Sequence, residues 1–209
     1  MNNIEHEKMI EKFGYVVKNN LCLFQRGILS QWWGGFEGQD SSFKVDTIDL
    51  YSWYIQDHVE KHRDNAGLLN KISKEYKHLY FNCCEQWMMA CKAILFNDAD
   101  TFKLIMDTKS PSKQKDLGRV IANYDQDVWE NYKYRIVLTG NMHKFEQNPE
   151  LEEFLMSFNP FTIFAEAAPW DKVWGIGLGP DDPKALDINT WEGENLLGKV
   201  LMDVRLSID

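Results

Sequence analysis

The residues Cys84–Phe96 predict an apolar helix that also carries one carboxylate and one amine. Glu85 and Lys92 are seven residues apart, about two turns at roughly 3.6 residues per turn, so both side chains lie on one face. Apolar residues such as Met88 and Met89 share that face. A carboxylate and an amine are costly to bury. The chain must therefore fold around a helix that holds them either as a buried ion pair or as a reactive site.

Length and charge limit the classes of fold and partner. The 209 residues are enough for one well-packed domain, and the net charge is −9. A protein that follows duplex DNA needs clustered Lys and Arg, so this acidity argues against that class. A small nucleotide needs only one local basic pocket. We therefore expect a small-molecule partner, although a local groove for a modified nucleic acid stays open.

The cysteine and histidine patterns give no indication of a metal site. The cysteines form no CxxC pair, and the histidines form no HxxH or HExxH pattern. We expect buried, reduced thiols in a cytoplasmic protein that uses no metal or cofactor. No run of residues approaches the ~18 apolar residues of a membrane span, and the charged start predicts no signal peptide. The oligomeric state is left open.

The hydrophobic pattern predicts several helices and a few short strands. Helices are expected within residues 1–20, at 84–96, from Asp98 or Asp100 to 106, from Pro111, at 125–144, at 150–157 and at 195–207. Strands are expected within 21–36, at 77–81 and at 161–167. The charged segment 37–78 is interpreted as a partly helical insertion on the main body.

A glycine-rich stretch, residues 166–179, is the second motif of interest. Closely spaced glycines let a backbone approach a ligand or donate amides to an anion. The spacing is not that of a Rossmann fold, and we expect no parallel strand before it. Taken alone, the stretch is better interpreted as a plain surface loop.

An ordered series of motifs resembles the NADAR family, which is named for a proposed association with NAD and ADP-ribose. The motifs are Leu29–Trp32, Cys84–Ala93, Lys115–Arg119 with Trp129, Lys144–Asn148, Glu166–Ala167, Asp171–Gly177 and Trp191–Gly198. Any one of them is weak evidence, but their common order is highly specific. The sequence departs from the family pattern at Cys84, at Gln31 and in the longer connection from Phe36 to His78.

The resemblance implies a single compact, mostly helical α+β domain with a few short strands over residues 1–209. It also implies cleavage of the N-glycosidic bond between a ribose and a base. Family members act on ribosylamino-pyrimidine phosphates of the riboflavin pathway, and related members remove ADP-ribose from guanine. The expected substrate is therefore a ribosyl or ADP-ribosyl small molecule, or an ADP-ribosylated nucleic acid. The alternative is a non-catalytic module that binds NAD or ADP-ribose unchanged.

The chemistry of the motif residues suits such a reaction. Cleavage develops positive charge at the anomeric carbon, which Glu85 can stabilise as a carboxylate. A desolvated Lys92 can attack that carbon of an opened ribose and form a Schiff base. Asp171 can act as a second carboxylate or hold ribose hydroxyls. Trp174 can stack on the base, and Arg119 can grip a phosphate with its guanidinium.

The predicted catalytic residues are thus Glu85, Lys92 and Asp171. The predicted substrate-binding residues are Ser30, Trp32, Arg119, Trp129, Trp174, Gly175 and Asn195. We expect these groups to converge on one pocket. Each has a structural alternative: an ion pair for Glu85 and Lys92, core packing for Trp32 and Trp129, a solvated charge for Arg119, and turn or helix caps for Asp171 and Asn195.

Overall fold

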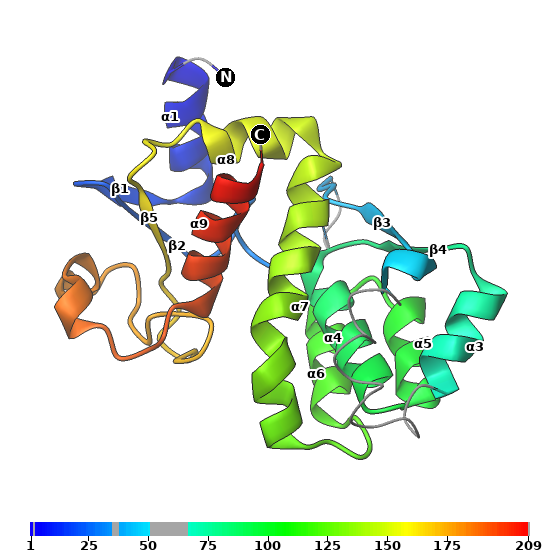
Figure 1. The fold of residues 1–209 in the computed structure, drawn as a ribbon. Helices are drawn as coiled ribbons and strands as arrows, with labels where there is room; N and C mark the ends of the chain where they lie inside the picture. The colour runs from blue at the N-terminus through cyan, green and yellow to red at the C-terminus, as the bar shows by residue number, and fades with distance from the viewer. Residues whose placement is uncertain (2, 35–37, 51–66, 209) are drawn as a thin grey trace. The chain divides into compact units, whose positions relative to one another are not determined.

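The computed structural model describes residues 1, 3–34, 38–50 and 67–208. The chain divides into two compact units (Figure 1). The first unit contains residues 1–33 and 137–209, and the second contains residues 34–136. Each unit is described by itself, and helix α7 (Gln126–Glu146) contributes residues to both.

The first unit is built on a three-stranded sheet in the order β1–β2–β5. β1 (Val16–Lys18) and β2 (Leu21–Phe24) form an antiparallel hairpin. Asn19 and Asn20 join them with φ angles of 48° and 62°, values that suit the tight two-residue turn of a twisted hairpin. β5 (Ile163–Glu166) pairs in parallel with β2, with Leu21 opposite Ile163.

Apolar residues cover this sheet. One cluster joins it to the following loop and contains Leu21, Leu23, Ala165, Ala167, Ile176, Leu178 and Ala185. Three rings, Phe154, Phe158 and Phe164, pack edge to face with centroids 5.3 and 5.2 Å apart. The helices of this unit besides α7 are α1 (Asn3–Phe13), α8 (Pro149–Met156), α9 (Leu196–Ser207) and the 3-10 turns η2 (Pro183–Leu186) and η3 (Ile188–Thr190).

The loop after β2 is held by a fully buried lysine. The Nζ atom of Lys144, on α7, donates hydrogen bonds to the carbonyls of Ile28 and Ser30 at 2.5 and 3.0 Å. Buried carbonyls without donors are costly, so this amine fixes the path of the loop that contains the first family motif.

The second unit places α4 (Cys84–Leu95) at its centre. Helices α5 (Ala99–Asp107) and α6 (Pro111–Arg119) lie beside α4 (Figure 1). All residues of α4 except Lys92 are buried, as expected for a helix that is apolar on nearly every face. Among its described residues, this unit also contains α3 (Gly67–Glu75) and the antiparallel pair β3 (Phe43–Asp46) and β4 (His78–Phe81).

The boundaries of the helices beside α4 follow from their caps. Asp98 accepts a hydrogen bond from the Thr101 amide at the start of α5. Ser110 accepts from the Lys113 amide at the start of α6, where Pro111 occupies the first turn. Both starts were expected from the residue types, because such side chains satisfy amides that a helix start leaves open.

The mostly helical α+β class with short strands is confirmed, and two local expectations are wrong. Residues 16–18 form β1 where only a helix was expected, because they pair with β2. The strand before the glycine-rich loop, β5, is parallel to β2, so the expectation of no parallel strand there was also wrong. Within the proposed insertion 37–78, residues 37 and 51–66 lie outside the described residues. The single domain over 1–209 stays a prediction.

The edge of β5 that faces away from β2 forms hydrogen bonds with one side chain. Asn195 donates from Nδ2 to the Phe164 carbonyl at 2.8 Å and accepts at Oδ1 from the Glu166 amide at 3.1 Å. It thus makes the two hydrogen bonds that a neighbouring strand would make. A Cβ atom on Gly198 would lie 2.0 Å from the same Phe164 carbonyl, so this glycine allows α9 to approach β5 closely.

Replacing Asn195 by Ala should lower the free energy of unfolding by about 2 to 4 kcal/mol, because one buried and one partly buried strand group lose their partners. Urea unfolding measures this change. Asn189→Ala is the control, since Asn189 is exposed and bonds only to Asp187; it should change stability by less than about 0.5 kcal/mol. An Asn195→Ala protein as stable as the control would contradict the assigned tether.

Candidate active site

Lys92 lies in the last turn of α4, in the second unit, and is half-buried. Its Nζ atom donates a hydrogen bond to the Gly118 carbonyl at 2.8 Å. Gly118 is in the last turn of α6, where helix carbonyls have no amide partner within the helix. The amine therefore satisfies an open carbonyl at the negative end of α6, a favourable place for a cation.

Close packing between α4 and α6 makes this contact available. A Cβ atom on Gly118 would lie 1.8 Å from the Met89 sulfur, so a larger residue requires Met89 to move. The absence of a side chain at residue 118 thus brings the α6 backbone against α4. The same glycine supplies the carbonyl that positions Lys92.

Two aromatic rings lie close to the Lys92 amine. The Nζ atom lies 4.2 Å from the centroid of the Tyr124 ring and 5.3 Å from that of Trp129. Trp129 is buried, at 9% exposure, and Tyr124 is 41% exposed. Burial lowers the pKa of Lys92 below its ordinary value, because desolvation disfavours the charged amine. The carbonyl and the rings favour the charged amine and burial opposes it; the net effect is a lowered pKa, so a larger fraction of Lys92 is neutral than of a solvated lysine.

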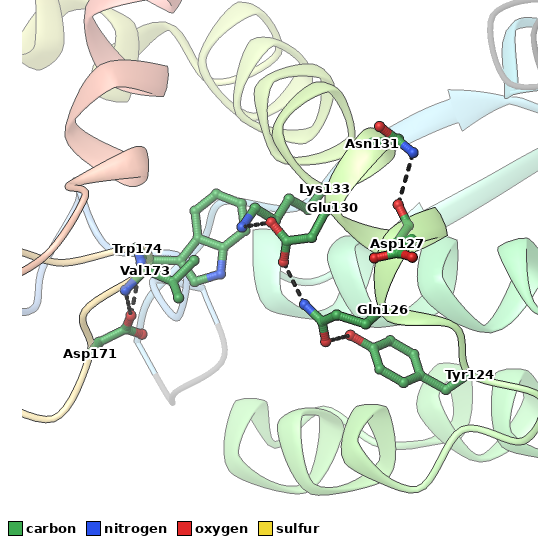
Figure 2. A network of polar contacts seen from close by, with 9 residues as sticks. All are labelled: Tyr124, Gln126, Asp127, Glu130, Asn131, Lys133, Asp171, Val173 and Trp174. Atoms are coloured by element: carbon green, nitrogen blue, oxygen red, sulfur yellow. Dashed lines mark hydrogen bonds and ion pairs between the residues drawn. The ribbon is translucent and has the colours of Figure 1, made fainter.

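Tyr124 is the first member of a chain of polar contacts (Figure 2). Its hydroxyl donates to Gln126 Oε1 at 2.6 Å, and Gln126 Nε2 donates to Glu130 Oε1 at 2.6 Å. Glu130 then pairs with Lys133, which is only 5% exposed. None of these residues was expected to belong to the site. Their spacing at the start of α7 resembles that of an ordinary polar helix face, so the sequence carries no clear signal for them.

Glu85 lies in the first turn of α4 and is 3% exposed. A carboxylate there is stabilised by the positive end of the helix dipole. Lys92 lies at the opposite end of α4 from Glu85, and its amine donates a hydrogen bond to Gly118 on α6 rather than to Glu85. This contact weakens the alternative in which Glu85 and Lys92 exist only as a structural ion pair. The catalytic role of Glu85 stays a prediction.

Arg119 follows Gly118 and points into solvent. Its guanidinium pairs with Asp116 at 3.2 Å, and both side chains are about two-thirds exposed, at 67% and 66%. Such an exposed pair contributes little to stability and is easily exchanged for another anion. The predicted phosphate contact of Arg119 is compatible with this position and stays a prediction.

The glycine-rich loop of the first unit is shaped by Asp171. Its Oδ1 atom accepts hydrogen bonds from the amides of Val173 and Trp174 at 3.0 and 2.8 Å (Figure 2). The Asp171 backbone carbonyl accepts from the Gly177 amide at 3.1 Å. Asp171 therefore organises the turn that presents Trp174, which is half-buried. Its second carboxylate oxygen is not used in these bonds.

The same loop covers the start of α9. The amides of Asn195, Leu196 and Leu197 donate to the carbonyls of Gly175, Val173 and Trp174 at 3.0 to 3.1 Å. A helix start can bind an anion only through open amides, and these are already used within the protein. The geometry of Asn195 therefore supports a structural tether, and its predicted contact with substrate is untested.

The structure brings the predicted residues together in groups. Ser30 and Trp32 are joined by a 3.2 Å hydrogen bond from the Trp32 amide to Ser30 Oγ. Lys92 and Trp129 share one site in the second unit. Asp171, Trp174, Gly175 and Asn195 share one loop in the first unit. Convergence of all these groups on a single pocket stays a prediction.

Other reactive groups contribute little within the described residues. All four cysteines are buried and form no disulfide, and burial raises the pKa of Cys83 to about 12, which makes its thiol a poor nucleophile. The described part of the chain contains no group of three or more His, Cys, Asp or Glu side chains arranged for a metal ion. It also contains no helix long and apolar enough to cross a membrane.

Labelling of Lys92 by an amine reagent should reach half its maximal rate at a lower pH than labelling of a model lysine peptide, whose pKa is about 10.4. The pKa of Lys92 is lower in the folded than in the unfolded protein, so the neutral amine forms at a lower pH. Burying the charged amine destabilises the fold at low pH, and this destabilisation is lost as the pH rises from the folded-state to the unfolded-state pKa. Peptide mass spectrometry across a pH series measures this. Coincident curves for the protein and the peptide would contradict the desolvated site.

Comparisons with known proteins support this fold and identify relatives of the chain. An N-glycosidase of Acanthamoeba polyphaga mimivirus is 47% identical over 121 residues, which cover 58% of this chain and 71% of that protein. Protein irg-1 of Caenorhabditis elegans is 34% identical over 141 residues, covering 66% of each chain. The NMR structure of the Escherichia coli protein YbiA matches with a TM-score of 0.59 and 20% identity, over 92% of this chain and 87% of that one, which supports the fold alone.

The family model described as NADAR domain matches residues 24–209, which include every candidate residue named above. The chain therefore belongs to the NADAR domain family.

Proposed function

We propose that this chain hydrolyses the N-glycosidic bond between a ribose and a base, with Lys92 as the nucleophile and Glu85 as the carboxylate. The enzyme class rests on membership of the NADAR family and on the 47% identity to the mimiviral N-glycosidase. The chain is an N-glycosidase-type hydrolase. The substrate and the roles of individual residues are our proposal.

One observation carries the proposed mechanism: the half-buried amine of Lys92 is fixed against the Gly118 carbonyl, between two aromatic rings. A solvated lysine is almost fully protonated near pH 7 and cannot attack carbon. Desolvation lowers the pKa of Lys92 and increases the neutral fraction that can react.

In the proposed reaction, the neutral Lys92 amine bonds to the anomeric carbon while the bond from that carbon to the base nitrogen breaks. The base leaves with its electron pair and takes up a proton. The bound nitrogen has two protons to lose: one balances the proton taken up by the base, and the other passes to the ring oxygen when the ring carbon–oxygen bond breaks, which leaves an imine between Lys92 and the sugar. Water then hydrolyses the imine, which releases the sugar and restores the amine. Glu85 would stabilise the positive charge that develops at the anomeric carbon.

We propose a ribose phosphate or an ADP-ribose as the sugar portion of the substrate. Arg119 supplies an exposed guanidinium that an incoming phosphate can draw from Asp116. Trp174, presented by the Asp171 turn, supplies a ring for stacking on a planar base. A guanine carrying ADP-ribose and a ribosylamino-pyrimidine phosphate of the riboflavin pathway are the two candidates to compare.

The test incubates purified protein with both candidates and identifies the products by mass spectrometry. Release of ADP-ribose would make the enzyme one that removes a modification from guanine. Release of ribose phosphate would make it an enzyme of metabolite clearance. If both candidates survive but one raises the melting temperature, the protein is a binding module and the catalytic roles are withdrawn.

Glu85→Gln and Lys92→Ala should each lower turnover by at least about 100-fold, because each removes a group proposed to act in the reaction. Initial rates on the cleaved substrate measure this, with the melting temperature as a check of folding. Glu75→Gln and Lys113→Ala are matched controls at exposed helix positions and should retain full turnover. Full activity in either site variant would overturn the mechanism.

A further inference from the structure

Tyr124 is the most exposed group recorded around the Lys92 amine. Its ring centroid is 4.2 Å from the Nζ atom, and its exposure is 41%, whereas Trp129 is 9% exposed. Tyr124 lies in the connection between α6 and α7, outside any helix or strand. Its position therefore depends on side-chain contacts rather than on a helical or strand backbone.

Two contacts hold the Tyr124 ring in place. Phe96 packs against it edge to face, with centroids 5.2 Å apart. The hydroxyl donates to Gln126 at 2.6 Å, and Gln126 donates in turn to Glu130. Glu130 pairs with Lys133, a lysine that is 5% exposed and fixed within α7 (Figure 2). The tether thus joins a loop residue to a rigid helix.

We propose that Tyr124 is a positioning residue: its ring, tethered through Gln126 and Glu130 to Lys133, covers the Lys92 amine and holds it against the Gly118 carbonyl. The catalytic use of that amine rests on the function proposed above, but the covering itself does not. A ring over an amine excludes water and restricts the directions in which the amine can move.

The charged groups near Lys92 can also shift the pKa of its amine. On α6, Asp116 and Arg119 pair with each other in solvent. Burial raises the pKa of Tyr124, with Glu130 and Asp125 adding to the effect. On α4 itself, Glu85 is at the opposite end of the helix.

The other elements that pack on α4 add further charged groups. Of these, α5 contributes Asp100, Lys103 and Asp107, and β4 contributes His78, which pairs with Asp46. The ring attracts the charged amine and also keeps water from it, and the pKa of Lys92 is lowered because burial is the larger effect; uncovering the amine should therefore move the pKa upward.

The test measures the pH profile of Lys92 labelling by peptide mass spectrometry in Tyr124→Ala, Tyr124→Phe and Gln126→Leu. In Tyr124→Ala the midpoint should rise by at least about half a pH unit, roughly a threefold change in the ionisation constant, and the maximal rate should increase because access improves. Tyr124→Phe and Gln126→Leu keep the ring but lose the tether, so they should shift the profile in the same direction by less.

Tyr80→Ala is the control, because Tyr80 is 66% exposed on β4 and should leave the profile unchanged. Circular dichroism and the melting temperature establish that each variant is folded. If Tyr124→Ala fails to fold, the other two variants decide the question. Profiles that coincide with the wild type in every folded variant would overturn the positioning role.

Substrate turnover separates this inference from the proposed function. If the labelling profile shifts in the Tyr124 variants but Lys92→Ala keeps full turnover, Tyr124 covers the amine and the proposed mechanism is rejected. If the labelling profile is unchanged in the Tyr124 variants but Lys92→Ala loses turnover, the role of Tyr124 is rejected and the mechanism is kept. If both the proposed function and the positioning role hold, Tyr124→Phe should lower kcat more than it changes KM, because a ring without its tether to Gln126 positions the amine less well but does not alter substrate binding.

Discussion

The hydrogen bond from the Lys92 amine to the Gly118 carbonyl is the interaction on which the candidate site depends. It requires α4 and α6 to approach so closely that Met89 occupies the space where a side chain at residue 118 would lie. It also uses a carbonyl that the end of α6 leaves open, so the amine gains a partner without giving up its half-buried position. The packing of two helices thus determines where the Lys92 nitrogen lies.

In the first unit, polar side chains hold the glycine-rich loop in place. Asp171 fixes the turn before Trp174, and Asn195 completes the edge of β5, so the glycine-rich loop is held at both ends by buried or half-buried polar bonds. A ring presented by such a loop is well suited to stacking, because little freedom is lost when a planar ligand binds. The order of this loop is thus a property of the first unit by itself, as the Lys92–Gly118 contact is of the second.

The sequence predicted much of this fold because its signals are local. Asp98 and Ser110 predicted helix starts from residue type alone, and the apolar pattern of α4 predicted a buried helix. β1 was missed because it is short and is stabilised by pairing with β2. The parallel pairing of β5 depends on a partner more than a hundred residues away, as the register of Leu21 with Ile163 shows.

The candidate site was only partly predictable, for a related reason. The motifs named Lys92 and Trp129, which share one site, and Asp171 and Trp174, which share one turn. They gave no signal for Tyr124, since covering an amine is a property of three-dimensional position. In the motif Lys115–Arg119, the charged Arg119 attracted the functional prediction, whereas Gly118 makes the contact with Lys92.

The central claim is that the Lys92 amine bonds covalently to the sugar, and trapping tests it most directly. Protein and substrate would be mixed in the presence of sodium borohydride, which reduces an imine to a stable amine, and the peptides would be mapped by mass spectrometry. The account predicts a sugar adduct on the peptide that contains Lys92, with no adduct in Lys92→Ala. Substrate cleavage without an adduct on Lys92, or with the adduct on another residue, would contradict it.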